Sequence, residues 1–388
     1  MRSTSIAAQR TSGPDYSECL GDTGYPTVGV EEEFLLVDHT TSNPVMNNGE
    51  VIRRAANAGL KLESELTPCQ VETTTPVLDT AEQLKDSLTG LRATAAQAAH
   101  DSGARLLAVG VQPVAAGEHP ITDTGRYRRI AANFRHIADE QAICGCHVHV
   151  AVPDRATAVQ VCNHLRPWLP TLLAISANSP ISGGVDTGYA SWRSIMWSRW
   201  PSAGPPPFLE SVEHYGSVLA SMLDCGAIID EGQIYWDARP SVRYPTVEVR
   251  VCDVPSTVGE SVVLATLIRA LVMTALAAID RGDDASPISD GALRVAYWRA
   301  ARDGISDRLV DPSFATTVSA EHGVELLLRH VAEALDALDG DRKVEKSLRC
   351  LFRRGNGAIR QRRVHAAGGG VDTLVSFLAD TTVRTEDP

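Results

Sequence analysis

Three consecutive glutamates, Glu31, Glu32 and Glu33, stand between apolar residues in the segment GVEEEFLLVD at positions 29–38. Such a run makes a poor solvated surface and a poor hydrophobic core, so it predicts a strand that carries charge into a site. Side chains alternate between the two faces of a strand. Glu31 and Glu33 are therefore expected on one face, and Glu32 on the opposite, apolar face.

Paired carboxylates repel each other unless a cation lies between them. Hard oxygen ligands held in pairs suit Mg²⁺ or Mn²⁺. Glu31 and Glu33 therefore indicate a metal-dependent site. The alternative is an edge strand whose acidic residues form ordinary salt bridges.

A second strand is predicted at 70–75, QVETTT, because the segment is rich in β-branched residues and alternates in character. Gln70, Glu72 and Thr74 fall on one face of this strand. Glu72 thus becomes a third carboxylate that a neighbouring strand can bring to the same site.

The segment YPTVEVRVCD at 244–253 has the clearest alternation in the chain. Three valines form an apolar face, which leaves Thr246, Glu248, Arg250 and Cys252 on the other. Glu248 and Arg250 have two interpretations. They form an ion pair, or they act as a metal ligand and a phosphate clamp, because the planar guanidinium matches phosphate oxygens.

The segment ICGCHVHV at 143–150 contains Cys144, Cys146, His147 and His149, which suggests a zinc site at first sight. A strand places the two cysteines on one face and the two histidines on the other, which argues against a single ion bound by all four. We expect the cysteines to pack in the core and the histidines to point into a site.

The elements that must hold these strands are mostly helices. Early helices are predicted at 47–60, 79–100, 126–142, 154–177 and 208–224, with a short strand at 105–111. From residue 260 the chain is expected to be almost entirely helical, at 260–281, 288–303, 319–339, 341–352 and 356–366.

The connection at 178–207 is rich in Gly, Pro and Ser and also carries tryptophan and arginine side chains. It is too long for a plain connector, so we interpret it as a segment that covers a substrate. An interface loop or a surface loop is the alternative.

Composition narrows the class of protein. The chain has 388 residues, 44% of them hydrophobic, which is enough for a large core. A net charge of −12 argues against nucleic-acid binding, because phosphate contacts need a basic face. Eight scattered cysteines favour a reduced, cytoplasmic setting over a disulfide framework.

Neither candidate targeting segment is convincing. The first 20 residues lack a continuous apolar run, so they do not resemble a signal peptide. Residues 262–279 are apolar enough for a membrane helix, but Arg269 stands at the centre, where insertion costs roughly 2.5–3.5 kcal/mol. We therefore expect a buried core helix and no membrane partner.

Five motifs occur in a characteristic order: GVEEEFLLVD, QVE, GCHVHV, YPTVEVRVCD and GNGAIRQRR at 355–363. From about residue 26 to 380 the chain resembles the glutamate–cysteine ligase type 2 family, the bacterial carboxylate–amine ligases. The resemblance implies an α+β fold similar to glutamine synthetase and the guanido kinases, with a curved, mainly antiparallel sheet and helices on its convex side. It implies a flexible extension at 1–24 and one catalytic domain at 25–380, whose C-terminal part, from about 260, is helical.

The resemblance also implies ATP-dependent formation of an amide bond through an acyl phosphate, with release of ADP. By match of motif, the metal ligands for Mg²⁺ or Mn²⁺ would be Glu31, Glu33, Glu72, His147 and Glu248. Arg250 would hold the transferred phosphate and act in catalysis with Glu248 and Arg193, and Arg360 and Arg362 would contact ATP.

Elementary electrostatics gives these assignments a reason. A carboxylate must attack the γ-phosphorus of ATP, and both are anions, so cations must bring them together. The absence of a Gly-x-x-x-x-Gly-Lys-Ser/Thr element excludes a P-loop kinase but not this fold.

The resemblance implies a small carboxylic acid and a small amine as substrates. Glutamate and cysteine, or the substrates of a specialised amide ligase of secondary metabolism, fit equally well. The alternative activity is that of a metal-dependent amide hydrolase, in which the carboxylates and His147 activate water. A homo-oligomer is compatible with the sequence.

Overall fold

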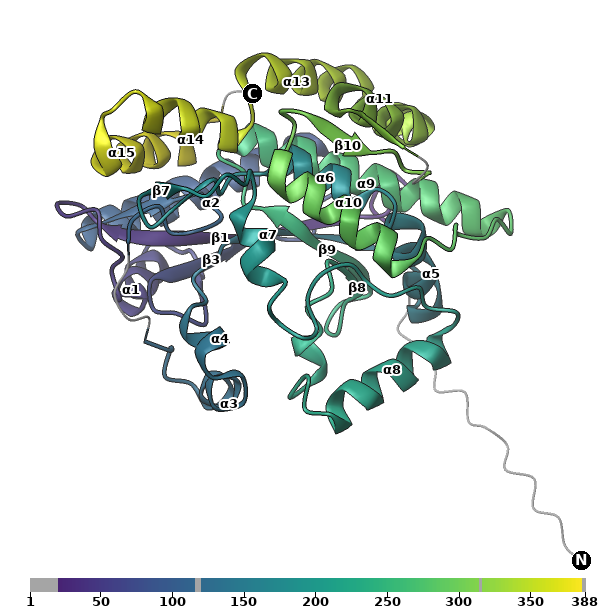
Figure 1. The fold of residues 1–388 in the computed structure, drawn as a ribbon, viewed down its shortest axis with the longest axis horizontal. Helices are drawn as coiled ribbons and strands as arrows, with labels where there is room; N and C mark the ends of the chain where they lie inside the picture. Colours follow the sequence, from purple (N-terminus) through teal and green to yellow (C-terminus); the bar gives the residue numbers. More distant parts are fainter. Residues whose placement is uncertain (1–19, 116–119, 314–315, 386–388) are drawn as a thin grey trace, which may run out of the picture.

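A seven-stranded sheet organises the chain (Figure 1). The computed structural model describes residues 20–115, 120–313 and 316–385, so most of the predicted extension at 1–24 lies outside the described residues. The strand order is β2-β3-β1-β5-β9-β8, with β4 also paired to β1, and these pairings are antiparallel. The strands are β1 (Val28–Asp38), β2 (Glu63–Ser64), β3 (Gln70–Thr74), β4 (Ala104–Leu107), β5 (Gly145–Ala151), β8 (Ala238–Pro240) and β9 (Thr246–Asp253).

The described residues form more helices than the sequence predicts, because 126–142, 154–177 and 319–339 each form two shorter helices and the helices at 192–197 and 370–382 were not predicted. Those before β9 are α1 (Asn48–Asn57), α2 (Ala81–Asp101), α3 (Gly125–Phe134), α4 (His136–Asp139), α5 (Arg155–Leu165), α6 (Leu169–Ser176), α7 (Trp192–Trp197), α8 (Val212–Asp224) and the 3-10 helix η2 (Glu231–Gln233). Those after it are α9 (Val258–Asp280), α10 (Asp290–Asp303), α11 (Ala320–His330), α12 (Ala332–Ala337), α13 (Asp341–Arg354), α14 (Gly357–Ala366) and α15 (Gly370–Thr382).

Most helices form a layer on one face of the sheet, while α3, α4 and α8 flank the opposite face (Figure 1). The expected α+β architecture is therefore confirmed, with a helical layer that also receives the C-terminal helices. A large apolar cluster joins the inward faces of β5 and β9 to α5, α6 and α9. The face of the sheet without this layer is left free for polar side chains.

Strand β1 lies inside the sheet and pairs with β3, β4 and β5. The edge-strand interpretation of its glutamates is therefore wrong. The alternation is as expected: Glu31 and Glu33 remain partly exposed, whereas Glu32 is 0% exposed on the helical side.

Glu32 is neutralised inside the protein by Arg92 of α2. The guanidinium donates to both carboxylate oxygens at 2.8 and 2.5 Å, and the hydroxyl of Ser261 donates to one of them at 2.6 Å. Arg92 also donates to the main-chain carbonyls of Pro255 and Thr382. The buried Glu32–Arg92 pair thus links β1 and α2 to the residues just before α9 and to the last residue of α15.

Helix α9 is the long apolar helix of the sequence, and by length and composition alone it could span a membrane. A capping box formed by Thr257 and Glu260 begins it. Arg269 is buried at its centre and donates to the carbonyls of Pro26 and Asp79, each at 2.7 Å. These contacts fit the core-helix interpretation, because the charged side chain is satisfied within the protein.

Several predicted elements are divided. The helix expected at 126–142 breaks at Arg135, whose φ of +53° cannot continue a helix. The segment 178–207 is not an irregular loop, because it contains a small hairpin, β6 (Ile181–Ser182) with β7 (Val185–Asp186), and helix α7. A second hairpin, β10 (Arg308–Val310) with β11 (Thr317–Ser319), interrupts the C-terminal helices.

The expected face of Cys252 is also wrong. Strand β9 contains a β-bulge opposite β5, so that Val249 pairs with Val148 but Cys252 pairs with Cys146. The extra residue reverses the alternation beyond Arg250. Cys252 consequently joins the apolar cluster.

We predict that Glu32→Gln lowers the free energy of unfolding by about 3–5 kcal/mol, because it leaves the Arg92 charge buried without its partner. Urea unfolding followed by circular dichroism measures this. The matched control is Glu33→Gln on the other face of β1, for which no such loss is expected. Equal stability of the two variants would contradict the assigned role of the Glu32–Arg92 pair.

Candidate active site

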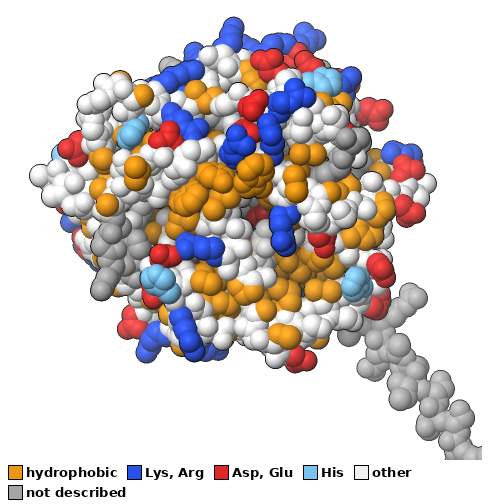
Figure 2. All heavy atoms as spheres, viewed as in Figure 1, with side chains coloured by type: hydrophobic (Ala, Val, Ile, Leu, Met, Phe, Trp, Pro, Cys, Tyr) orange, Lys and Arg blue, Asp and Glu red, His pale blue; other side chains and the backbone are white. Residues whose placement is uncertain are grey.

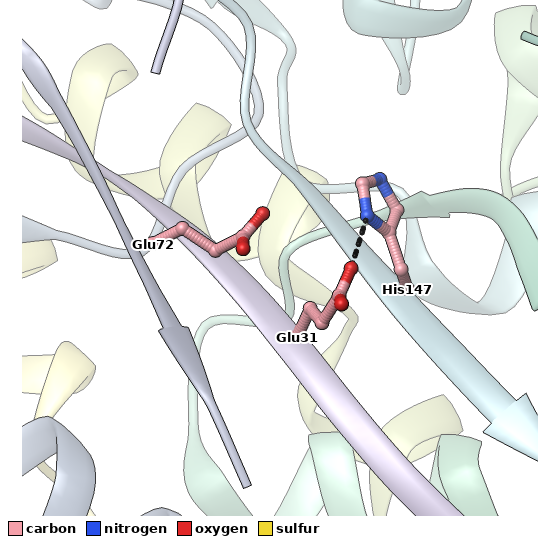
Figure 3. A group of neighbouring side chains, drawn as sticks. All are labelled: Glu31, Glu72 and His147. Atoms are coloured by element: carbon pink, nitrogen blue, oxygen red, sulfur yellow. Dashed lines mark hydrogen bonds and ion pairs between the residues drawn. The ribbon is translucent and has the colours of Figure 1, made fainter. Parts of the chain in front are cut away.

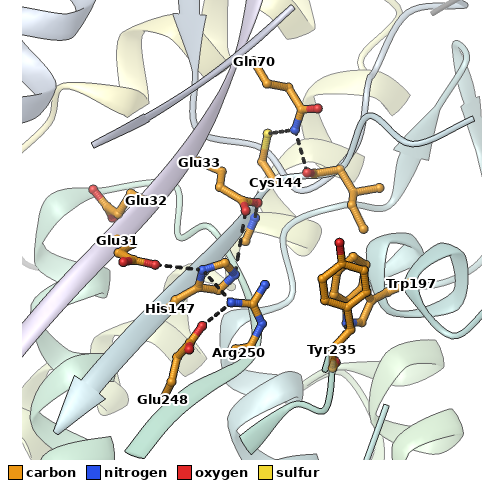
Figure 4. Close-up of polar contacts among 12 residues, drawn as sticks. Glu31, Glu32, Glu33, Gln70, Cys144, His147, Trp197, Tyr235, Glu248 and Arg250 are labelled. Carbon is orange, nitrogen blue, oxygen red and sulfur yellow. Dashed lines mark hydrogen bonds and ion pairs between the residues drawn. The ribbon is translucent and has the colours of Figure 1, made fainter. Parts of the chain in front are cut away.

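Acidic and imidazole side chains form a row across the free face of the sheet (Figures 3 and 4). The strand register creates this row, since residues directly opposite each other on neighbouring strands share a face. The opposed pairs are Glu33 with Glu72, Glu31 with His147, and His149 with Glu248. The structure thus brings together all five residues that the sequence assigned to a metal site.

Glu31 lies at the middle of the row, between the two histidines. Its carboxylate oxygens lie 3.3 Å from Nδ1 of His147 and 3.5 Å from Nε2 of His149. Burial alone would raise the pKa of Glu31, but the contacts with His147 and His149 hold it below its ordinary value. Burial and the positive charge of Arg250 lower the pKa of His147, so its imidazole favours the neutral, ligand-competent form.

Like charges dominate the end of the row at β3. Burial and the charges of Glu65, Glu31 and Glu33 raise the pKa of Glu72 well above its ordinary value. Burial and the charge of Glu33 raise the pKa of Glu65 to about 8. Carboxylates held this closely are costly to ionise together without a cation.

Glu65 also belongs to this end of the row and was not predicted from the sequence. It follows β2 directly, and Glu63 of that strand faces Glu72. The alternation in ESEL at 63–66, next to the QVE strand, is the signal that places Glu65 on the same face. His149, which was expected only to point into a site, also joins the row.

Three groups of side chains could each hold a metal ion, because the ligand atoms within each group lie within 4.8 Å of one another. The groups share members: Glu31, Glu72 and His147; Glu31, His149 and Glu248; and Glu33, Glu65 and Glu72. Oxygen-rich sets, two of them with one imidazole, suit Mg²⁺ or Mn²⁺ better than zinc. The Nε2 atoms of both histidines are buried and have no hydrogen-bond partner, so the donor set fits divalent cations.

Arginine side chains balance the other end of the row. Arg239 of β8 donates to both carboxylate oxygens of Glu248, at 2.9 and 3.1 Å, and Arg250 forms a second ion pair with Glu248. Burial opposes ionisation, but these two arginines hold the pKa of Glu248 well below its ordinary value. Arg250 also lies 3.3 Å from Nδ1 of His147 (Figure 4). The two residues form the ion pair that was one of the two interpretations. Arg250 nevertheless lies among the carboxylate and imidazole side chains of the row.

Arg193 of α7 is buried, and its side chain reaches the main chain of β9 at Arg250. Its guanidinium donates to the main-chain carbonyls of Arg250, at 3.2 Å, and Val251, at 3.4 Å. A Cβ atom at Gly145 would lie 2.4 Å from Nη2 of Arg193, so the absence of a side chain there makes this route possible. Arg193 therefore braces the bulged part of β9 that carries Arg250.

Arg360 and Arg362 have partners elsewhere. Arg360 pairs with Glu260 at 2.6 Å, and Arg362 pairs with Asp186 at 2.9 Å. Both side chains project from α14, in the helical layer. The structure brings neither to the row, and their assignment to ATP contacts stays a prediction.

The surface above the row is hollowed and bordered by hydrophobic side chains (Figure 2). Trp197 and Tyr235 stand beside Arg250 (Figure 4), and the Arg250 guanidinium lies 6.0 Å from the centre of the Trp197 ring. The segment at 178–207 supplies Trp197 and also lines a separate pocket of about 1320 Å³ between α4 and α7. Its expected closure over a substrate stays a prediction.

Comparison with known proteins identifies relatives along most of the chain. A model of the glutamate-cysteine ligase family 2 (GCS2) matches residues 27–376. A protein from Nocardia farcinica named "Putative glutamate–cysteine ligase 2-1" is 52% identical over 360 residues, which cover 92% of this chain and 94% of that protein. A protein from Mycolicibacterium smegmatis named "Putative glutamate–cysteine ligase 2-3" is 49% identical over 92% of this chain and 98% of its own length.

Solved structures share the fold at low sequence identity. The glutamate–cysteine ligase of Francisella tularensis in complex with AMP has a TM-score of 0.67 and 16% identity, and the match covers 92% of this chain and 88% of that one. The ligase PafA, solved in complex with the ubiquitin-like protein Pup, has a TM-score of 0.53 and 13% identity over 91% of this chain and 71% of that one.

We predict opposite effects of Glu72→Gln with and without divalent cation. At pH 8, where burial and the neighbouring carboxylates oppose the ionisation of Glu72, the neutral amide should raise the melting temperature of the cation-free protein. The same variant should gain less in melting temperature than the unsubstituted protein when Mg²⁺ or Mn²⁺ is added. Glu63→Gln, an exposed carboxylate on the next strand, is the control. A full cation response in Glu72→Gln would contradict the ligand assignment.

Proposed function

Because the chain belongs to the glutamate-cysteine ligase family 2, we propose that it is an ATP-dependent ligase that joins a carboxylic acid to an amine through an acyl phosphate. The observation that carries this proposal is the row on the free face of the sheet, where glutamates in three overlapping groups meet Arg250. This arrangement can hold several anions together, which is the central difficulty of the reaction.

The first half of the reaction brings two anions into contact. An oxygen of the acid attacks the γ-phosphorus, the bond to the bridging oxygen breaks, and ADP leaves. Divalent cations held by Glu31, Glu33, Glu72, His147 and Glu248 would supply positive charge to the phosphate oxygens. Arg250 can hold the transferred phosphoryl group with its remaining donors, because its Nε is buried and unpartnered.

The second half consumes the acyl phosphate. The amine nitrogen attacks the acyl carbon, and phosphate leaves with the oxygen that the acid brought. Water must be kept out during this step, or the activated acid would be hydrolysed. Trp197 and Tyr235, which lie beside Arg250, provide an apolar border on that side of the row.

Glutamate and cysteine are the first substrates to test, because the relatives at 52% and 49% identity carry the name glutamate–cysteine ligase. A specialised amide ligase would use the same row with other acids and amines. The two differ in the pockets that hold the substrates' remaining groups and share the chemistry of the row.

We predict that the purified protein releases ADP from ATP and Mg²⁺ only when an acid and an amine substrate are both supplied. Arg250→Ala should lower this rate about 10²-fold or more, as expected for a group that stabilises transition-state charge. The control is Arg281→Ala, an exposed arginine paired with Asp283 far along the chain, which should keep the original rate. A coupled assay for ADP measures all three proteins.

The metal-dependent hydrolase gives the opposite pattern. In that case an amide would be cleaved without nucleotide, and Arg250→Ala would have little effect. Failure of a broad panel of acids and amines to elicit ADP release would reject the ligase.

A further inference from the structure

The turn between β8 and β9, residues 241–245, lies beyond the end of the row that Glu248 forms. Val242 and Tyr244 of this turn are 40% and 55% exposed, whereas Glu248 and His149 are buried. An exposed turn therefore borders this end of the row, and Glu65 and Glu72 mark the opposite end, at β2 and β3.

Tyr244 is an exposed aromatic side chain in contact with the row. Its ring meets the ring of His149 edge to face, at 5.9 Å between centroids. His149 lies on the free face, so this contact places the Tyr244 ring at the border of that face. Large exposed aromatic side chains at the border of a site indicate a binding surface.

The turn holds Tyr244 in a defined position. The main-chain N–H of Ser241 donates to the carbonyl of Thr246 at 2.9 Å, and that of Thr246 donates to the carbonyl of Tyr244 at 2.8 Å. Pro245 fixes one backbone angle between them. A surface that is ordered before binding loses little entropy when a flat ligand stacks on it.

Positive charge lies next to the ring in the same turn. Arg243 precedes Tyr244 directly, and both side chains are exposed. A cation and an aromatic face are therefore presented together at this end of the row.

We propose that Tyr244 is the stacking surface for the base of the nucleotide, and that Arg243 flanks the phosphate nearest to it. This inference rests on the proposed function and gives it a direction: the base lies beyond His149, at the β8–β9 turn, and the γ-phosphate lies farther along the row, toward Glu72.

The test measures binding without turnover. Calorimetric titration of the whole protein with ATP and Mg²⁺, without acid or amine, is compared with titration by inorganic tripolyphosphate and Mg²⁺, which lacks the base. Tyr244→Ala should weaken ATP binding about tenfold, as expected for the loss of one base–aromatic stack, and should leave tripolyphosphate binding unchanged. Tyr244→Phe should keep the affinity for ATP, because the stacking ring remains.

The matched control is Trp298→Ala, which removes an exposed aromatic ring from α10. It should bind ATP like the unsubstituted protein. If Tyr244→Ala also binds ATP like the unsubstituted protein, the base does not lie at this turn, while the ligase proposal stands. If the unsubstituted protein binds neither ATP nor tripolyphosphate, the ligase proposal fails and the base subsite fails with it.

Discussion

The alternation of β1 forces carboxylates onto both faces of one central strand, and each face needs its own source of positive charge. On the helical side, Arg92 and Ser261 neutralise Glu32 permanently, and Arg92 ties the N-terminal strand to residues near 255 and 382. On the free side, arginine pairs with Glu248 alone among the carboxylates of the row, and Glu31 relies on imidazoles. The carboxylate on the helical face is therefore neutralised inside the protein, whereas the free face keeps a surplus of carboxylates that the proposed cations would balance.

The direction of Arg250 depends on irregularities rather than on regular strand geometry. A bulge in β9 lets both Arg250 and Asp253 lie on the free face, although they are three residues apart. Asp253 then accepts hydrogen bonds from Ser179 and Ser191 at 2.6 and 2.8 Å, which attaches the 178–207 segment to the sheet. Arg193 of that segment returns to the bulged carbonyls. The 178–207 segment, which the sequence predicts to cover a substrate, thus also supports the strand that carries Arg250.

The sequence carries the alternating strands, because period-2 patterns report directly which side chains share a face. The pattern places Glu31 and Glu33 on one face, whereas the set of Glu31, Glu33, Glu72, His147 and Glu248 as metal ligands is what the resemblance to the glutamate–cysteine ligase type 2 family implies. It does not predict Arg92, because a single arginine within the apolar stripe of a helix looks like a surface residue until its buried partner is known. It also misplaces Cys252, because a bulge has no pattern of its own in that valine-rich strand. Arg239 is recognisable only once the strand register is known, whereas the alternation in ESEL at 63–66 carries a sequence signal for Glu65.

The central claim is that the row activates a carboxylate by transferring phosphate to it. Isotope transfer tests this most directly: an acid substrate labelled with ¹⁸O in its carboxylate is incubated with ATP, Mg²⁺, the amine and the protein, and the released phosphate is analysed by mass spectrometry. An acyl phosphate gives its bridging oxygen to phosphate when the amine attacks, so one ¹⁸O per phosphate is predicted. Unlabelled phosphate formed together with the amide would contradict the account.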